Sequence, residues 1–223
     1  MKKKKLFLNI VLVTMIAFTS MKIAGRNIEL SHARAINAEL KANSKSEALK
    51  SQNEDYRFWL TIEGTQVDNP VVQSDDNEFY LENDFNKNDS IAGTLFMDYR
   101  NDYLNDRNTI IYGHHMKDGS MFGELKKFRD EDFFNANNKI TINNDEDINT
   151  YEVFSVYVTD NSTDYLKVSF NDELYSEYLQ EAVNKSMYKS NIDVNTDDKI
   201  ITFSTCSYDF KDARLVVHAK LVD

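Results

Sequence analysis

The feature that most constrains the fold is a succession of short, strand-like runs that begins at Tyr56 and continues to the end of the chain. Each run is rich in β-branched and aromatic residues, and Asn, Asp or Gly residues separate the runs. Such residues favour a pleated, half-buried surface, and short strands joined by turns are typical of sandwiches and barrels. We therefore expect a mainly β domain, an antiparallel sandwich or barrel, over residues 56–223. The runs are YRFWLTIEGTQVDNPVVQ (56–73), AGTLFMDY (92–99), NTIIYGHH (108–115), KITINN (139–144), TYEVFSVYVT (150–159), DKIITFST (198–205) and ARLVVHAKLV (213–222).

Two stretches break the strand pattern with helical spacing. Residues 120–137 carry apolar residues at positions 121, 122, 125 and 128, which corresponds to about two helical turns. Residues 171–190 place apolar pairs at intervals of four, and Asn171 or Asp172 can cap the start. The second stretch predicts an amphipathic helix inserted between two strands.

The N-terminus predicts a membrane segment. Four lysines precede a mostly apolar run, Leu6 to Ala24, that polar residues interrupt. Its 19 residues would form a helix of roughly 28 Å, close to the ~30 Å hydrocarbon core. We expect residues 1–26 to form a cytoplasmic lysine block and an uncleaved single-pass anchor, with the rest of the chain extracellular at the cell membrane. A cleaved signal peptide is the alternative, although no clear cleavage site is present.

Residues 27–55 lack Gly and Pro and predict a polar helical stalk. Residues 27–223 contain 20 basic and 37 acidic residues, a net charge of −17. Nucleic acid and anionic lipid both require clustered Lys and Arg, so this surface argues against either as the main partner. No zinc-binding spacing occurs, and the acidic stretch 143–149 is more typical of a solvated hairpin tip than of a calcium loop.

The single cysteine, Cys206, cannot form an intramolecular disulfide. A free cysteine is most often a small buried hydrophobic residue. Here, however, it follows a strand-like run and precedes a polar loop, and such positions often display reactive groups. Cys206 is therefore either structural or a nucleophile.

A nucleophilic thiol needs a proton carrier. His32 lies in the predicted stalk, and His218 is more consistent with a structural role in the last strand. His114 and His115 follow a strand and point in opposite directions if the extended geometry continues. Only one of the two can face a given thiol, and alternation does not choose between them.

An oxyanion requires a donor, for which Arg214 is the candidate. It opens the last strand, eight residues after Cys206, and the loop between them can bring both to adjoining strand ends. An ordinary surface arginine lying along its neighbours is the alternative.

These residues match a known family. TCSYDFKDARLVVHAKL (205–221) resembles the sortase signature, and NTIIYGHHM (108–116) resembles its histidine motif. DYRFWLTIEGTQVDNPVVQ, GTLFMDYRN and YGHHMKDGSMFGELKKF resemble class B sortases in particular, and the resemblance covers residues 54–222. It implies an eight-stranded β-barrel with N-terminal helices and a helix between strands six and seven.

The resemblance also implies site roles. Cys206 would be the nucleophile, His114 the general acid and base, and Arg214 the oxyanion donor, with no cofactor. Ser204 lies on the same strand face as Cys206, and Tyr165 and Leu166 precede the inserted helix. These three are candidate substrate contacts, although core or loop roles suit Tyr165 and Leu166 equally well.

The implied reaction is transpeptidation. Cys206 would attack a Thr-Gly or Thr-Asn type of bond in the C-terminal sorting signal of a secreted protein. An amine of the peptidoglycan cross-bridge, or of its lipid-linked precursor, would then resolve the acyl-enzyme. Two alternatives compete: a cysteine L,D-transpeptidase, which expects a glycine directly before its cysteine, and a non-enzymatic binding domain with an inert Cys206.

Overall fold

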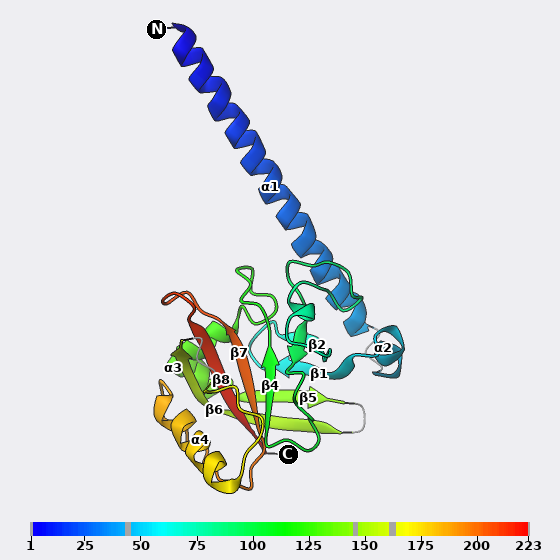
Figure 1. Cartoon of the computed structure of the whole chain (residues 1–223), viewed down its shortest axis with the longest axis vertical. Coiled ribbons are helices and arrows are strands. Elements are labelled where there is room, and N and C mark those ends of the chain that lie inside the picture. The colour runs from blue at the N-terminus through cyan, green and yellow to red at the C-terminus, as the bar shows by residue number, and fades with distance from the viewer. Residues whose placement is uncertain (1, 43–45, 145–146, 161–163, 223) are drawn as a thin grey trace.

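A computed structural model describes residues 2–42, 46–144, 147–160 and 164–222, and its strands close into a barrel (Figure 1). Around the barrel the order is β1, β2, β3, β4, β7, β8, β6, β5. The eight-stranded barrel predicted from the resemblance is confirmed. The strands are β1 (Tyr56–Ile62), β2 (Asp68–Val72), β3 (Leu95–Met97), β4 (Asn108–Tyr112), β5 (Lys139–Asn143), β6 (Ile148–Thr159), β7 (Ile200–Cys206) and β8 (Arg214–Leu221).

Most neighbouring strands are antiparallel, but β2 pairs with β3, and β4 with β7, in parallel. The expectation of a purely antiparallel sheet is wrong for these two pairs. Parallel neighbours need a long crossover connection, and residues 113–199 provide one between β4 and β7. This crossover contains β5, β6 and the inserted helix, so its two ends become neighbours only when the barrel closes.

Alternation along the strands fills the barrel interior. Phe58, Leu60 and Ile62 of β1 point inward, each at most 1% exposed, and join the main core. Trp59 points outward, to a second cluster that includes Leu40. This outer cluster attaches the N-terminal helices to the barrel wall.

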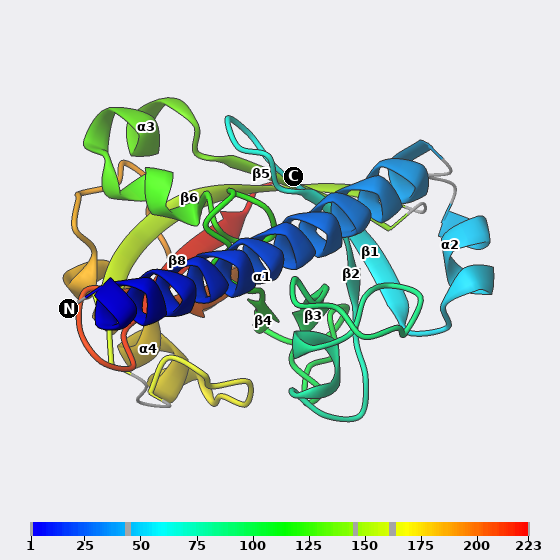
Figure 2. The same ribbon diagram turned by 90° about the horizontal axis from the view of Figure 1, so that it is seen from above.

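The helices lie outside the barrel (Figures 1 and 2). They are α1 (Lys2–Ala42), α2 (Ser46–Gln52), α3 (Glu131–Ala136) and α4 (Asp172–Lys185), with short 3₁₀ turns η1 (Phe79–Leu81) and η2 (Leu125–Arg129). Helix α4 confirms the predicted insertion between β6 and β7, and the Asn171 side chain caps it by accepting from Leu174 N at 2.8 Å. The stretch 120–137 forms two pieces, η2 and α3, because Asp130 is extended and caps a new helix.

The N-terminal segment corrects one prediction. Helix α1 runs unbroken across residue 26, and its first half projects away from the barrel (Figure 1). Among the described residues, no helix contains a stretch that is both long and apolar enough to cross a membrane. Asn9, Thr14, Thr19 and Lys22 dilute the apolar run. The predicted single-pass anchor, and the cell-membrane location that depended on it, are therefore wrong.

The second half of α1 packs on the barrel. Leu40 is buried in the outer cluster and Ile36 packs against that cluster, while Leu30 and Ala33 pack against the main core. These residues recur every three or four positions and form one face of the helix. Of the predicted stalk 27–55, residues 43–45 lie outside the described residues, and the domain boundaries at 26 and 55 stay predictions.

His218 is at the centre of a polar network between the barrel and α4. It is fully buried, with Nδ1 2.8 Å from Thr202 Oγ1 and Nε2 2.9 Å from the Tyr157 hydroxyl. Thr202 donates its own proton to Asn108 Oδ1 at 2.7 Å, so it accepts from His218 Nδ1–H. Nε2 then accepts from Tyr157. Burial, and secondarily the charge of Lys185, lower the pKa of His218 to about 3.

This buried neutral imidazole predicts acid sensitivity. Between pH 6.5 and 3 the unfolded chain binds a proton at position 218 that the folded chain does not, so stability falls as pH falls. At pH 5 the loss amounts to about 2 kcal/mol relative to neutral pH. In urea unfolding at pH 7 and pH 5, His218→Gln should lose this part of the pH dependence.

His32, exposed on α1, provides the control, because His32→Gln should retain the wild-type difference between the two pH values. An unchanged pH dependence in His218→Gln would contradict a neutral, buried His218.

Candidate active site

The candidate residues gather where β4, β7 and β8 end side by side. In the parallel pair, Tyr112 of β4 lies opposite Ser204 of β7. The pairing continues past β4, since Gly113 N donates to Ser204 O at 3.4 Å and Thr205 Oγ1 donates to Gly113 O at 2.7 Å. Two residues further along each chain, this register brings His114 beside Cys206. Neighbouring strands are about 4.8 Å apart.

On its other side Cys206 pairs with Arg214, the first residue of β8. The thiol-bearing residue is exposed, in contrast to the six preceding residues of β7, which are all buried. Arg214 is half-buried, and its Nη1 lies 3.2 Å from its neighbour's carbonyl, Ala213 O. The order across the three strand ends is therefore histidine, cysteine, arginine.

The two histidines have different partners. His114 Nε2 lies 2.7 Å from the Leu81 carbonyl oxygen, which can only accept, so Nε2 carries the proton. This leaves Nδ1 of the neutral ring as the proton acceptor. His115 Nδ1 lies 2.8 Å from Cys206 O and thus contacts the backbone of Cys206. Among the hydrogen bonds of the described residues, none joins His114 to the thiol.

The loop that joins β7 to β8 is anchored by an ion pair. Arg129 at the end of η2 donates to both carboxylate oxygens of Asp209, at 2.8 and 3.0 Å, and Ser207 Oγ also donates to Asp209. The hydrogen bonds from Ser207, and then those from Arg129, lower the pKa of Asp209. Tyr208 packs edge-on against His115. The loop is therefore held by two contacts, Asp209 with Arg129 and Tyr208 with His115.

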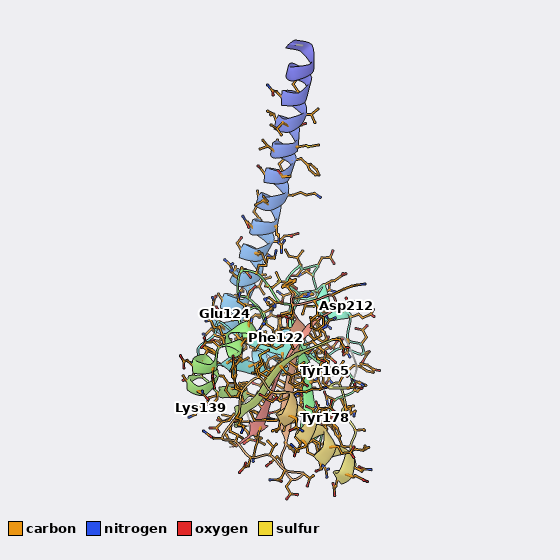
Figure 3. All side chains as sticks on the ribbon, turned by 90° about the vertical axis from the view of Figure 1, so that its left-hand side faces the viewer. Phe122, Glu124, Lys139, Tyr165, Tyr178 and Asp212 are labelled. Atoms are coloured by element: carbon orange, nitrogen blue, oxygen red, sulfur yellow. The ribbon has the colours of Figure 1, made fainter. Side chains whose placement is uncertain are left out.

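The predicted substrate contacts lie together on the outer face of β7. Ser204 and Tyr165 are buried and joined by a 3.1 Å hydroxyl contact, and half-buried Leu166 packs beside Tyr165. Burial raises the pKa of Tyr165, while the bond to Ser204 partly offsets that rise. Figure 3 shows Tyr165 near Tyr178 of α4, whose hydroxyl donates to Tyr165 O at 2.7 Å.

An ion pair between exposed Arg100 and buried Asp98 holds this segment against the barrel. Arg100 Nη2 donates to Asp98 Oδ2 at 2.7 Å and to Leu166 O at 3.1 Å. Asp98 is fully buried. Burial alone would raise its pKa, but the hydrogen bonds from Arg100 and Tyr112 outweigh this and lower it.

A cavity of about 750 Å³ opens at the strand ends. One side is formed by residues of the barrel domain, which are Ile91, His114, His115, Met116, Cys206 and Tyr208. The opposite side belongs to α1, and its lining residues are Lys22, Ile23, Gly25, Arg26 and Glu29. Figure 2 shows α1 passing above the end of the barrel.

Several residues of this site escape sequence reasoning. Leu81 acts through its backbone carbonyl, which any residue supplies, and Arg129 lies 80 positions before its partner. Tyr208 is an exception among these residues, because the sequence already places it in the loop that follows Cys206. The contribution of α1 had no signal, since the pattern in residues 6–24 was interpreted as a membrane segment.

The arrangement can perform covalent acyl transfer. It provides an exposed thiol, an imidazole nitrogen able to accept a proton, and a permanently charged guanidinium on the next strand. A barrel with these groups at three adjoining strand ends corresponds to the class of cysteine acyltransferases.

Comparison with known proteins specifies the family. The sortase domain family matches residues 60–222. Sortase B of Listeria monocytogenes is 37% identical over 237 residues, covering 96% of this chain and 95% of its own. The chain belongs to the sortase family, as a class B sortase, and is a cysteine transpeptidase.

Solved structures agree with this assignment. Sortase B from Bacillus anthracis, in complex with AAEK1, has a TM-score of 0.82 at 39% identity, covering 88% of this chain and 99% of its own. The Staphylococcus aureus sortase B-substrate complex has a TM-score of 0.80 at 31% identity, covering 88% of this chain and 99% of its own.

The Arg129–Asp209 pair predicts a positioning effect. Arg129→Met should free the loop between β7 and β8 and slow peptide cleavage by roughly fivefold, about 1 kcal/mol of transition-state stabilisation. The melting temperature should change little, because the pair is partly exposed.

Lys126 is an exposed residue of the same turn, so the Lys126→Met variant should cleave the peptide at the wild-type rate. Equal rates in both variants would contradict a role of Arg129 in holding the loop.

Proposed function

We propose that Cys206 is the nucleophile, His114 the proton carrier and Arg214 the oxyanion donor of a sorting reaction. The observation that carries this proposal is the register across three strands, which brings His114 and Arg214 to either side of an exposed Cys206. The family membership supports a peptide substrate, since one related structure is described as a sortase B-substrate complex.

In the first step the thiolate of Cys206 attacks the scissile carbonyl carbon of a C-terminal sorting signal. A C–S bond forms, the C–N bond breaks, and protonated His114 gives its proton to the leaving amine. Arg214 is charged at any relevant pH and stabilises the oxyanion without exchanging a proton. The product is a thioacyl-enzyme that retains the N-terminal part of the secreted protein.

In the second step an amine of the peptidoglycan cross-bridge, or of its precursor, attacks the thioester. Neutral His114 takes the proton from the incoming amine, and the thiolate of Cys206 leaves. The two half-reactions need opposite protonation states of one imidazole, which a histidine can supply near neutral pH. The surface protein is thereby joined to the cell wall.

The substrate peptide would lie along the outer face of β7. Leu166 and Tyr165 form a wall beside Ser204, and this wall leads to Cys206. Because Ser204 and Tyr165 are buried, their contact with a peptide requires the segment before α4 to shift. Arg100, bonded to Leu166 O, limits how far that segment can move.

Single substitutions test the assignment. Cys206→Ala should abolish cleavage of a sorting-signal peptide, and His114→Ala and Arg214→Ala should each reduce it by about 10³-fold or more. The reaction can be followed by fluorescence release and by mass spectrometry of the acyl-enzyme. Circular dichroism should show an intact fold in all three variants.

Matched controls separate these roles from their surroundings. His115→Ala should lose only about tenfold, since this ring acts on the Cys206 backbone and transfers no proton. Lys211 lies in the loop between β7 and β8, three residues before Arg214, and its side chain is 93% exposed, so Lys211→Ala should resemble wild type. Full activity in Cys206→Ala, or a greater loss in His115→Ala than in His114→Ala, would overturn the assignment.

A further inference from the structure

The face of α1 that packs on the barrel changes character where it reaches the cavity. Between Leu30 and Leu40 this face is apolar and packed against the core clusters. Its continuation toward the N-terminus, at spacings of three and four residues, consists of Glu29, Arg26 and Lys22, which line the cavity. A packing face turns charged where it contacts water or a ligand instead of a core.

The charges on this face have no ion-pair partner among the residues that the structure describes. Further along α1, Arg34 pairs with Asp118 at 2.5 Å, and Lys41 pairs with Asp68. Within the part of the chain that is described, no ion pair engages Lys22, Arg26 or Glu29; Lys22 packs over the Phe18 ring. The paired charges fix the helix, whereas the three at the cavity are available to a bound molecule.

The helix is held firmly enough to form a binding wall. Asp118 belongs to the loop that follows His114 and His115, so its pair with Arg34 ties α1 to the histidine segment. Burial would raise the pKa of Asp118, but the hydrogen bonds from Ser120 and Arg34 lower it, so the carboxylate stays charged at neutral pH. The cavity therefore has one wall from α1 and one from the strand ends.

The order of the charges defines the molecule that fits. Glu29 is nearest to the packed part of the helix, Arg26 lies about 4.5 Å further along the axis, and Lys22 lies about 10.5 Å beyond Glu29. A ligand complementary to this face carries an ammonium group at the Glu29 end and an anionic group several ångströms away. A peptide amine that also bears a carboxylate has this pattern.

We propose that Glu29 and Arg26 form an acceptor subsite, in which Glu29 binds the ammonium of the incoming amine and Arg26 binds a carboxylate of the same acceptor. This inference rests on the proposed function, because it concerns the second substrate of that reaction. Glu29 favours the charged, unreactive form of the amine, so it contributes to binding and not to the chemical step. The ammonium first loses one proton to solvent. The neutral amine then attacks the thioester, His114 takes a second proton from the nitrogen as the C–N bond forms, and the C–S bond to Cys206 breaks to release the thiolate.

Binding of two probes to the full chain tests the subsite directly. Triglycine carries an ammonium and a carboxylate that are at most roughly 10 Å apart, and the peptide can bend to bring them to the closer spacing of Glu29 and Arg26; triglycinamide lacks the carboxylate. In NMR titrations, Glu29→Gln should raise the Kd of both probes about three- to fivefold. Arg26→Gln should raise the Kd of triglycine by a similar factor and leave that of triglycinamide unchanged.

Glu39 lies exposed on the same helix and does not line the cavity, so Glu39→Gln is the matched control and should bind both probes as wild type does. Binding by Glu29→Gln that equals wild type, or that is weakened no more than in Glu39→Gln, overturns the role of Glu29. Equal effects of Arg26→Gln on the two probes overturn the role of Arg26.

A kinetic measurement separates this subsite from the proposed function. With a sorting-signal peptide and a fixed concentration of triglycine, Glu29→Gln should lower the ratio of transpeptidation to hydrolysis, and Glu39→Gln should keep the wild-type ratio. A wild-type chain that cleaves no sorting peptide contradicts the proposed function, while the titrations still decide the subsite.

Discussion

The parallel pairing of β4 with β7 is the interaction on which the site depends. Residues 113–199 lie between β4 and β7 in sequence. The parallel register of the two strands nevertheless brings the end of β4 beside the end of β7. Antiparallel pairing of β7 with β8 then adds Arg214 on the far side of Cys206. Backbone hydrogen bonds of a closed barrel thus fix the spacing of three groups that no local segment could hold together.

Several buried polar residues lie behind these strands. His218, Thr202 and Asn108 hydrogen-bond one another beneath α4, and Asp98 with Arg100 holds the segment that contains Leu166. Buried polar groups of this kind cost stability unless every partner is in place. When these hydrogen bonds are all made, they hold the outer elements in one register on the barrel, and the wall of Tyr165 and Leu166 belongs to those elements.

How far the sequence predicts this protein can be judged from particular residues. Alternation revealed the strands, the spacing around Tyr175 and Tyr178 revealed α4, and the position of Cys206 revealed a strand end. Local patterns cannot reveal that β4 lies beside β7, because that adjacency is a property of barrel closure. Alternation did not decide whether His114 or His115 faces the thiol, and only the resemblance to sortases distinguished them.

Other features had no local signal at all. In the sequence, Arg129 and Asp209 are indistinguishable from ordinary surface charges. They form an ion pair only because the fold brings η2 beside the loop after β7. The same lysine and arginine that were grouped with a membrane segment, Lys22 and Arg26, line the cavity beside Cys206. The error arose from interpreting an apolar stretch by its length. Its polar interruptions argued against a membrane span but gave no sign that α1 lines the cavity.

The cavity is lined partly by α1 and partly by the barrel domain, and this limits what experiments on a shortened protein can reveal. Five of its eleven lining residues come from α1, a helix that precedes the whole barrel in sequence. A catalytic domain prepared from β1 onward would keep Cys206, His114 and Arg214 but would present them on an open surface. Inhibitors selected against such a domain would bind a site that lacks the α1 side of the cavity, and their selectivity would not carry over to the full chain.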